Sequence, residues 1–204
     1  MSLPPLPDRP LSVTIYGAGA IGGVIGALLA KATGTGDIGE VTLIARGPHL
    51  DAMKADGLRL RRPDGEVEVI PVNATDDPGS LPPQDVVITA LKGHQIPPLA
   101  DKLAALMAPH ARILPVVNGV PWWYPIPDGK GGTKGAEEVD PGGVLWSAIG
   151  PDRAIGSIAY LGASSPEPGL IPTISKAIWI WAACPDRTGQ MSSVSPRCWK
   201  ARAG

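Results

Sequence analysis

The sequence predicts an α/β fold in which helices cover both faces of a parallel β-sheet. Short apolar runs rich in β-branched residues recur at 11–16, 41–45, 85–90 and 112–117. Apolar residues with helical spacing lie between several of these runs. Strands that alternate with helices form parallel sheets, because a parallel connection needs a crossover long enough to hold a helix. A third indication is a group of polar residues, described below, that follow the predicted strands.

A glycine-rich turn joins the first predicted strand to the first predicted helix. The strand covers 11–16, and the helix carries an apolar stripe formed by Ile21, Val24, Ile25, Leu28 and Leu29. Between them lies the motif G-x-G-x-x-G, formed by Gly17, Ala18, Gly19, Ala20, Ile21 and Gly22. This motif between a strand and a helix is the fingerprint of a dinucleotide site in a Rossmann-type, doubly wound parallel sheet.

Each glycine of the motif has its own physical role in that interpretation. Gly17 permits a tight turn, Gly19 leaves room for a pyrophosphate because it has no Cβ, and Gly22 allows close helix packing. The unpaired N–H groups and the dipole at the helix start would face the phosphates. The alternative is a purely structural glycine turn, since glycine is common in this chain (26 of 204 residues).

The residue that follows the second predicted strand indicates which dinucleotide is bound. The strand covers 41–45, with Glu40 before it and Arg46 after it. An acidic residue at this end would hydrogen-bond the 2′-hydroxyl of NAD, whereas an arginine suits the 2′-phosphate of NADP. A solvated loop arginine is the alternative, but the pattern favours NADP as the cofactor.

The next segment predicts an insertion without chemistry of its own. A short helix is expected over 48–56, with a proline early and Gly57 at its end. Alternating residues at 58–61 and 67–69, separated by a Pro-Asp-Gly turn, predict a β-hairpin.

Three polar residues follow the later predicted strands. Lys92 and Gln95 come after the strand at 85–90, and Asn118 comes after the strand at 112–117. Ligands of doubly wound sheets bind outside the carboxyl ends of the strands, so these side chains are candidates for a site. Taken singly, each would be a solvated loop residue.

A helix is expected between these two strands, and less regular structure after them. The helix runs to about Met107 and ends at Pro109, with an apolar face formed by Ile96, Leu99, Leu103 and Leu106. The Trp-Trp-Tyr cluster at 122–124 would pack in the core or an interface, or wall a substrate pocket. Beyond it we expect a mobile loop, a short apolar turn and two weak strands, the last at an edge because of its proline, at 128–135, 144–149, 154–161 and 169–174.

The two ends of the chain differ from the domain predicted over 11–176. Residues 1–10 are proline-rich and have no apolar signal segment, which predicts a disordered arm. Residues 177–204 hold three of the six tryptophans and both cysteines without a helical or strand period, which predicts an irregular tail.

The composition excludes several functional classes. A net charge of −1 gives no broad electrostatic basis for binding nucleic acid or an anionic membrane, and no run of eighteen apolar residues predicts a bilayer span. Three scattered histidines have no metal-ligand spacing, so no metal site is expected. Two cysteines without a secretion signal predict free thiols and a cytoplasmic protein.

These motifs resemble those of the ketopantoate reductase (2-dehydropantoate 2-reductase) family. The resemblance runs from about residue 13 to 174 and rests on Gln95 and on the segments 17–23, 41–46, 86–92 and 116–119. It implies reduction of 2-dehydropantoate, a 2-keto acid, with NADPH to pantoate, on the pathway to pantothenate and coenzyme A. It also implies that Arg46 holds the 2′-phosphate. Lys92 and Asn118 would then lie beside the nicotinamide and substrate, and Gln95 would line the same crevice.

One departure from the family is large. The resemblance implies a following helical domain with a catalytic lysine in a K-L-x-x-N motif, whereas Lys176 and Lys200 stand in other contexts. We therefore expect 177–204 to be the truncated or frame-altered start of that domain. Besides the reductase, two alternatives stay open: an NADP-binding protein with little or no catalysis, and a dehydrogenase acting on another keto or hydroxy acid. A homodimer also stays open.

Overall fold

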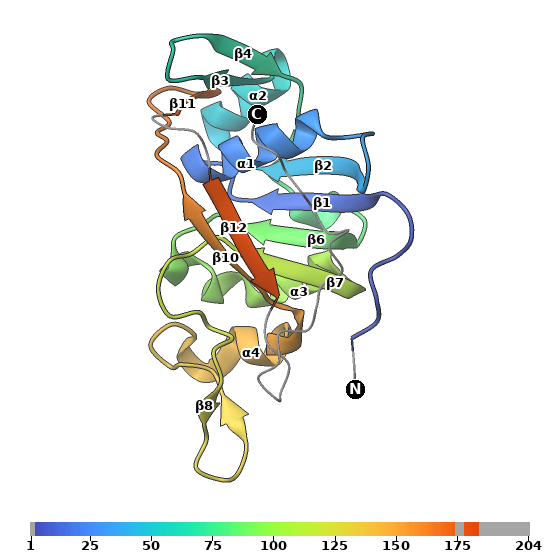
Figure 1. Cartoon of the computed structure of the whole chain (residues 1–204), viewed down its shortest axis with the longest axis vertical. Coiled ribbons are helices and arrows are strands. Elements are labelled where there is room, and N and C mark those ends of the chain that lie inside the picture. Colours follow the sequence, from blue (N-terminus) through green and yellow to red (C-terminus); the bar gives the residue numbers. More distant parts are fainter. Residues whose placement is uncertain (1–2, 174–177, 184–204) are drawn as a thin grey trace.

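The computed structural model describes residues 3–173 and 178–183. Its centre is a five-stranded sheet in which every pairing is parallel (Figure 1). The strands are β1 (Leu11–Tyr16), β2 (Ile38–Ile44), β5 (Asn73–Thr75), β6 (Gln84–Thr89) and β7 (Met107–Pro115). The sheet confirms the α/β prediction, and β5 is a short strand that the sequence analysis missed.

The strand order β5-β2-β1-β6-β7 is that of a doubly wound sheet. The chain first builds outward from β1 through β2 to β5, and then returns to the other side of β1 with β6 and β7. The carboxyl end of β1 is therefore the topological switch point, where such sheets bind ligands. A further strand, β10 (Ile155–Tyr160), lies next to β7, and two isolated parallel bridges, from Ile113 to Ala154 and from Val116 to Ser157, connect this segment to the end of the sheet.

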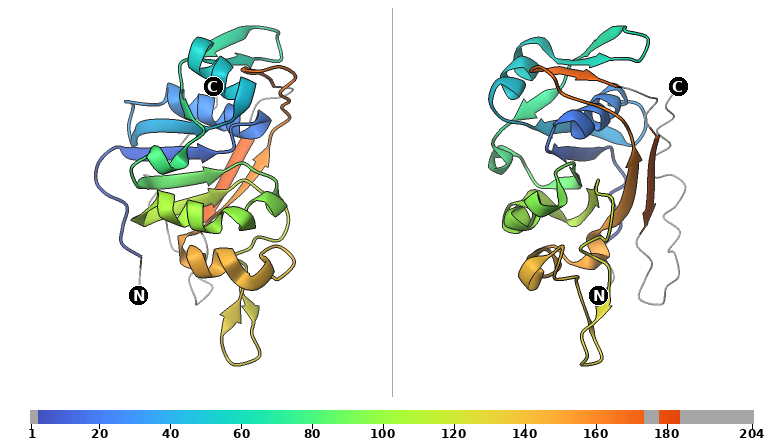
Figure 2. Two further views of the ribbon diagram at one scale, coloured as in Figure 1. Left: turned by 180° about the vertical axis from the view of Figure 1, so that it is seen from behind. Right: turned by 90° about the vertical axis from the view of Figure 1, so that its left-hand side faces the viewer.

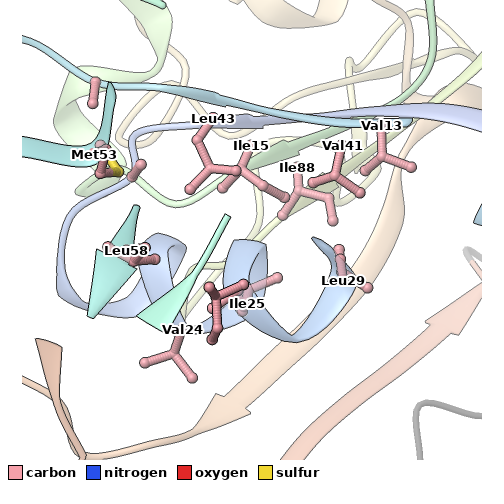
Figure 3. Packing of buried hydrophobic residues seen from close by; sticks show 14 of the residues in the cluster. Val13, Ile15, Val24, Ile25, Leu29, Val41, Leu43, Met53, Leu58 and Ile88 are labelled. Atoms are coloured by element: carbon pink, nitrogen blue, oxygen red, sulfur yellow. The ribbon is translucent and has the colours of Figure 1, made fainter. Parts of the chain in front are cut away.

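One face of the sheet packs against α1 (Ala20–Lys31). Successive side chains of a strand point to opposite faces, so β1 places both Val13 and Ile15 on this side. They form a buried core with Val24 and Ile25 of the helix (Figure 3). Burying side chains of this size stabilises the fold by about 1.5–3 kcal/mol each, so this core holds the glycine-rich turn in place.

The other face is covered by α3 (Ala100–Leu106) and α4 (Val144–Ala148). Figure 2 shows both helices on one side of the sheet and β10 on the opposite side. Val87, Leu103 and Leu145 are fully buried in this second core. The segment expected as a short turn at 144–149 is thus a helix for most of its length.

Small elements surround the central sheet. The remaining helix is α2 (Gly47–Asp56), and 3₁₀ turns occupy η1 (Pro78–Ser80), η2 (Gly93–Gln95), η3 (Pro97–Leu99), η4 (Pro141–Gly143) and η5 (Pro151–Arg153). A three-stranded sheet has the order β11-β3-β4, and two antiparallel pairs are β10 with β12 and β8 with β9. Their bounds are β3 (Leu58–Arg61), β4 (Val67–Ile70), β8 (Ile126–Pro127), β9 (Thr133–Lys134), β11 (Leu170–Pro172) and β12 (Ile178–Ala183). The predicted hairpin at 58–69 and the edge position of the 169–174 strand are confirmed.

The helix expected up to Met107 is shorter than predicted. It begins only at Ala100, after two 3₁₀ turns, because Pro97 and Pro98 lack the backbone N–H groups that would continue an α-helix through this segment. It ends at Leu106, and Pro109 lies within β7 rather than at a helix end. Pairing with β6 outweighs the local helical pattern here.

The expectations for both termini need correction. The arm expected to be disordered is fastened, since Leu6 packs against the core and Arg9 pairs with Asp85 at 2.7 Å. In the tail expected to be irregular, residues 178–183 form β12, which pairs with β10 along its length. The rest of that tail, 184–204 with both cysteines and Lys200, lies outside the described residues, as does Lys176.

The aromatic cluster belongs to the core, in agreement with the first of its two interpretations. Trp122 and Trp123 are buried and meet edge to face, with ring centroids 5.5 Å apart. Tyr124 is exposed. The loop expected at 128–135 carries β9, and the Asp128 carboxylate accepts hydrogen bonds from the backbone N–H groups of Lys130 and Gly132.

Candidate functional site

The carboxyl ends of the central strands lie in one row. Tyr16 at the end of β1 pairs with Ile44 of β2 and with Thr89 of β6, and Thr89 pairs with Pro115 of β7. The segments that follow these four residues therefore leave the same edge of the sheet, which we call the carboxyl edge. They carry most of the residues expected in the site, namely Gly17, Arg46, Lys92, Gln95 and Asn118.

The glycine-rich turn is anchored to both neighbouring strands. The N–H groups of Gly17 and Ala18 donate to the Ile44 carbonyl at 3.3 and 2.9 Å. Gly17 has φ +99°, and a Cβ there would lie 2.5 Å from Cδ2 of Leu91. Only glycine fits this turn without strain, as the motif predicted. On the other side, the Ala90 N–H donates to the Tyr16 carbonyl at 2.9 Å, which holds the segment that leads to Lys92 beside the turn.

Gly22 is tightly packed, whereas Gly19 faces open space in the described structure. A Cβ on Gly22 would lie 2.1 Å from the Gly17 carbonyl oxygen and 2.8 Å from Cβ of Ala90, so this glycine serves close packing of α1. A Cβ on Gly19 would meet no atom of the described residues within 4 Å, and its φ of −72° is open to any residue. Contacts within the described part of the chain therefore do not require glycine at position 19. The space beside it fits the backbone approach that a pyrophosphate needs.

The start of α1 offers N–H donors toward that space. Gly19 is the N-cap, no side chain caps the helix, and its first turn contains no acidic residue. The first N–H groups of a helix have no intrahelical partner, and the dipole adds partial positive charge there. Ala20 and Ile21 are only partly buried. The predicted motif residues therefore present the surface that an anion would bind.

Arg46 is exposed at the end of β2, where it is the N-cap of α2. It forms no ion pair within the described ranges, whereas Glu40 lies at the other end of β2 near Asn73. Burial raises the pKa of the Tyr16 hydroxyl, and the positive charge of Arg46 acts in the opposite direction. Its guanidinium is available to a ligand at the carboxyl edge.

Lys92 and Gln95 form one turn after β6. The N–H of Lys92 donates to Oε1 of Gln95 at 3.1 Å, and the N–H of Gln95 donates to the Lys92 carbonyl at 2.8 Å. Both side chains are exposed. Gln95 thus fixes the backbone that carries Lys92, and its lining of a crevice stays a prediction.

Asn118 is exposed three residues beyond β7. The end of β7 is held by β10, since the buried Ser157 hydroxyl donates to the Pro115 carbonyl at 2.8 Å. Gly119 follows with φ +112°, so the chain turns sharply after Asn118. The structure brings Asn118 to the same edge as Lys92, and the role of Asn118 stays a prediction.

His49 is a residue of this region that the sequence analysis missed. Its Nε2 lies 2.9 Å from the Ala18 carbonyl oxygen, and its Nδ1 accepts a hydrogen bond from the Gly169 N–H at 2.9 Å. Gly169 is 120 residues away in the sequence, so no local pattern indicates the contact.

The sequence predicted neither a metal site nor a membrane-spanning segment, and the described part of the chain bears on both expectations. Among those residues no three His, Cys, Asp or Glu side chains are grouped as metal ligands would be. None of the helices described is long and apolar enough to cross a bilayer.

The fold and the carboxyl edge define a Rossmann-type α/β protein with its candidate site at the switch point. The family model of ketopantoate reductase PanE/ApbA matches residues 13–122, and the chain belongs to this family. It is 44% identical over 163 residues to a 2-dehydropantoate 2-reductase of Mesorhizobium japonicum, an alignment that covers 79% of this chain and 48% of that protein.

Solved structures agree with this assignment. A protein of the ketopantoate reductase type from Ralstonia solanacearum is 34% identical with a TM-score of 0.71, covering 86% of this chain and 54% of that one. A D-mandelate dehydrogenase solved with NADH is 16% identical with a TM-score of 0.66, covering 88% and 50%, and shows a likeness of fold alone. The chain spans about half the length of its curated relative from Mesorhizobium.

Proposed function

We propose that this chain binds NADPH at the carboxyl edge and serves the reduction of 2-dehydropantoate to pantoate. The observation that carries the proposal is the open space at Gly19. Gly19 lies at the start of a helix with no acidic residue in its first turn, and none of the residues that the structure describes creates a steric need for glycine there. The NADPH-dependent activity of the family supports the choice of reaction.

Different residues of the carboxyl edge would bind different groups of NADPH. The N–H groups at the start of α1 would bind the pyrophosphate, as oriented donors do in sites of this kind. Arg46 would bind the 2′-phosphate through charge-assisted hydrogen bonds. Because Arg46 has no acidic partner in the described part of the chain, binding a phosphate would break no ion pair there. This arrangement supports NADPH over NADH.

When bound, NADPH supplies the hydride for reduction of a carbonyl carbon. The protein must then stabilise the negative charge that develops on the carbonyl oxygen. Lys92 is the cation that follows β6, and its backbone is fixed by Gln95. We assign Lys92 to that charge, and the Asn118 amide to orientation of the substrate.

A second candidate is NADPH binding with slow turnover. It is favoured by the exposure of Lys92, because a cation surrounded by water stabilises a developing charge less than one in a water-excluded site. A missing preorganised donor lowers the rate by about 10²–10³.

One preparation can test both candidates. NADPH and NADH would be titrated by the change in nicotinamide fluorescence, and pantoate formation would then be followed in the same sample. We expect tighter binding of NADPH than of NADH. Absence of NADPH binding would refute the proposal, and the rate of pantoate formation would decide between the two candidates.

A further inference from the structure

His49 connects the glycine-rich turn to a distant segment of the chain. It lies in the first turn of α2 and is partly buried. One ring nitrogen, Nε2, faces the Ala18 carbonyl oxygen, and the other, Nδ1, faces the Gly169 N–H, both at 2.9 Å. Gly169 immediately precedes β11, whose Ile171 packs over Gly23 of α1. The imidazole therefore bridges the turn and the strand behind it.

The two partners define the tautomer of His49. A backbone N–H can only donate, so Nδ1 must be unprotonated to accept from Gly169. A carbonyl oxygen can only accept, so Nε2 must carry the proton that is donated to Ala18. The neutral Nε2–H tautomer satisfies both partners, and no other form of the ring does.

The contact with Ala18 has a consequence for the next peptide. In a trans peptide the C=O of one residue and the N–H of the next point in opposite directions. The Ala18 C=O points toward α2, so the Gly19 N–H must point away from it. The Ala18 N–H is already held by the Ile44 carbonyl at 2.9 Å. Both peptide groups of Ala18 are therefore fixed, one by β2 and one by His49.

We propose that His49 is a positioning residue for the pyrophosphate-binding turn: its Nε2–H holds the Ala18 carbonyl and thereby aims the Gly19 N–H at the ligand. The inference rests on the proposed binding of NADPH. His49 itself touches no part of the cofactor in this account. Its hydrogen bond from Gly169 orients the ring, and its hydrogen bond to Ala18 orients the donor.

Two substitutions separate the two hydrogen bonds. In His49→Gln the side-chain amide N–H can reach the Ala18 carbonyl in place of Nε2, while the acceptor for Gly169 is lost. In His49→Asn the amide oxygen can replace Nδ1 as the acceptor for Gly169, while the shorter side chain cannot reach Ala18. Each variant loses one bond, so a similar drop in melting temperature is expected for both.

The expected result is a difference in binding between variants of similar stability. The Kd for NADPH should stay within about threefold of the wild-type value in His49→Gln and rise about tenfold or more in His49→Asn, the loss expected for one misaligned donor to a charged group. Equal affinity in all three proteins, or an equal loss in both variants, would overturn the proposal.

A second measurement needs no cofactor. The amide resonance of Gly19 in the ligand-free protein should be sharp and similar in wild type and His49→Gln, and shifted or broadened in His49→Asn. An unchanged Gly19 resonance in His49→Asn would overturn the positioning role. A wild-type protein that shows the expected resonances but binds no NADPH would refute the proposed function and leave the role of His49 in the turn supported.

Discussion

The two edges of the central sheet hold charged groups in opposite ways. At the amino edge, the buried Asp85 carboxylate at the start of β6 is surrounded by donors from the same chain. At the carboxyl edge, Arg46 and Lys92 are exposed, and in the described structure neither forms an ion pair. Strand β6 thus begins at the Asp85 carboxylate, which has partners within the chain, and leads to Lys92, which forms no ion pair among the described residues.

The amino edge is a closed network. Asp85 accepts hydrogen bonds from Arg9 at 2.7 and 3.0 Å, from the Ser12 N–H at 2.8 Å and hydroxyl at 3.0 Å, and contacts His110 Nε2 at 2.6 Å. Burial alone would raise the pKa of the Asp85 carboxyl, but the hydrogen bonds from Arg9, His110 and Ser12 hold it well below its usual range. The residues before β1 run along this edge (Figure 1).

The comparison relates the surroundings of a charged group to its role in stability or in binding. A buried carboxylate with all its partners inside the chain stabilises the fold and has nothing left to offer a ligand. Exposed cations and helix N–H groups without protein partners contribute little to stability but can bind an anion. We therefore expect substitutions at the amino edge to change stability and those at the carboxyl edge to change binding.

The largest effect is expected from Gly19→Val. The branched side chain enters a space that contains no atom of residues 3–173 or 178–183, so NADPH affinity should fall at least hundredfold, about 2.7 kcal/mol, while the fold persists. The matched control is Gly22→Ala, whose Cβ would overlap the Gly17 carbonyl and cost stability by about 1–3 kcal/mol. Titration with NADPH and urea denaturation would be measured for both. Normal NADPH binding by Gly19→Val would place the phosphates elsewhere.

Arg46→Ala should weaken NADPH more than NADH. A hydrogen bond between charged groups contributes about 1.5–3 kcal/mol, which corresponds to about a tenfold to hundredfold change in the ratio of the two Kd values. The free energy of unfolding should change little, because Arg46 is exposed. Equal weakening of both cofactors would show that Arg46 does not contact the 2′-phosphate.

Asp85→Asn should lower the free energy of unfolding by about 2 kcal/mol at pH 7, since it weakens several hydrogen bonds to a charged acceptor. The pKa of Asp85 is depressed in the folded state, so its stabilisation is fully present above the unfolded pKa of about 3.9 and is lost as the pH falls toward the folded pKa. The difference between wild type and variant should therefore shrink below about pH 4. Urea denaturation across this range would test it, and a constant difference would argue against the ionised network.

The smallest effect is expected from Gln95→Ala. The variant loses the side-chain acceptor for the Lys92 N–H, which water can replace because the turn is exposed. A loss of about 0.5–1.5 kcal/mol in unfolding free energy is expected, and Gln95→Glu, which keeps an acceptor oxygen, should recover most of it. If both variants lose the same stability, the hydrogen bond to Lys92 is not the reason.

The sequence was most informative where the structure depends on local pattern. Strand β1, helix α1 and the hairpin of β3 and β4 follow from apolar spacing and turn residues, and the steric roles of Gly17 and Gly22 follow from the motif. The segment at 107–109 was misassigned because pairing of Met107 with Gln84 is non-local. Contacts between distant residues carry no local signal.

At the carboxyl edge, too, features with a local sequence pattern could be predicted and contacts between distant residues could not. Residues that follow strands could be placed there from the order of elements alone. His49 could not, because its partner Gly169 lies 120 residues away, and neither could the pairing of Arg9 with Asp85 across 76 residues. Strand β12 also escaped prediction, since its sequence shows no alternation and its pairing with β10 depends on the rest of the fold.

Amide hydrogen exchange with and without saturating NADPH tests the central claim most directly. Our account predicts slower exchange in residues 17–22, 46–49 and 90–95 at the carboxyl edge, and no change in 9–12 and 84–86 at the amino edge. In a preparation that binds NADPH, unchanged exchange at the carboxyl edge, or protection centred on Asp85, would contradict it.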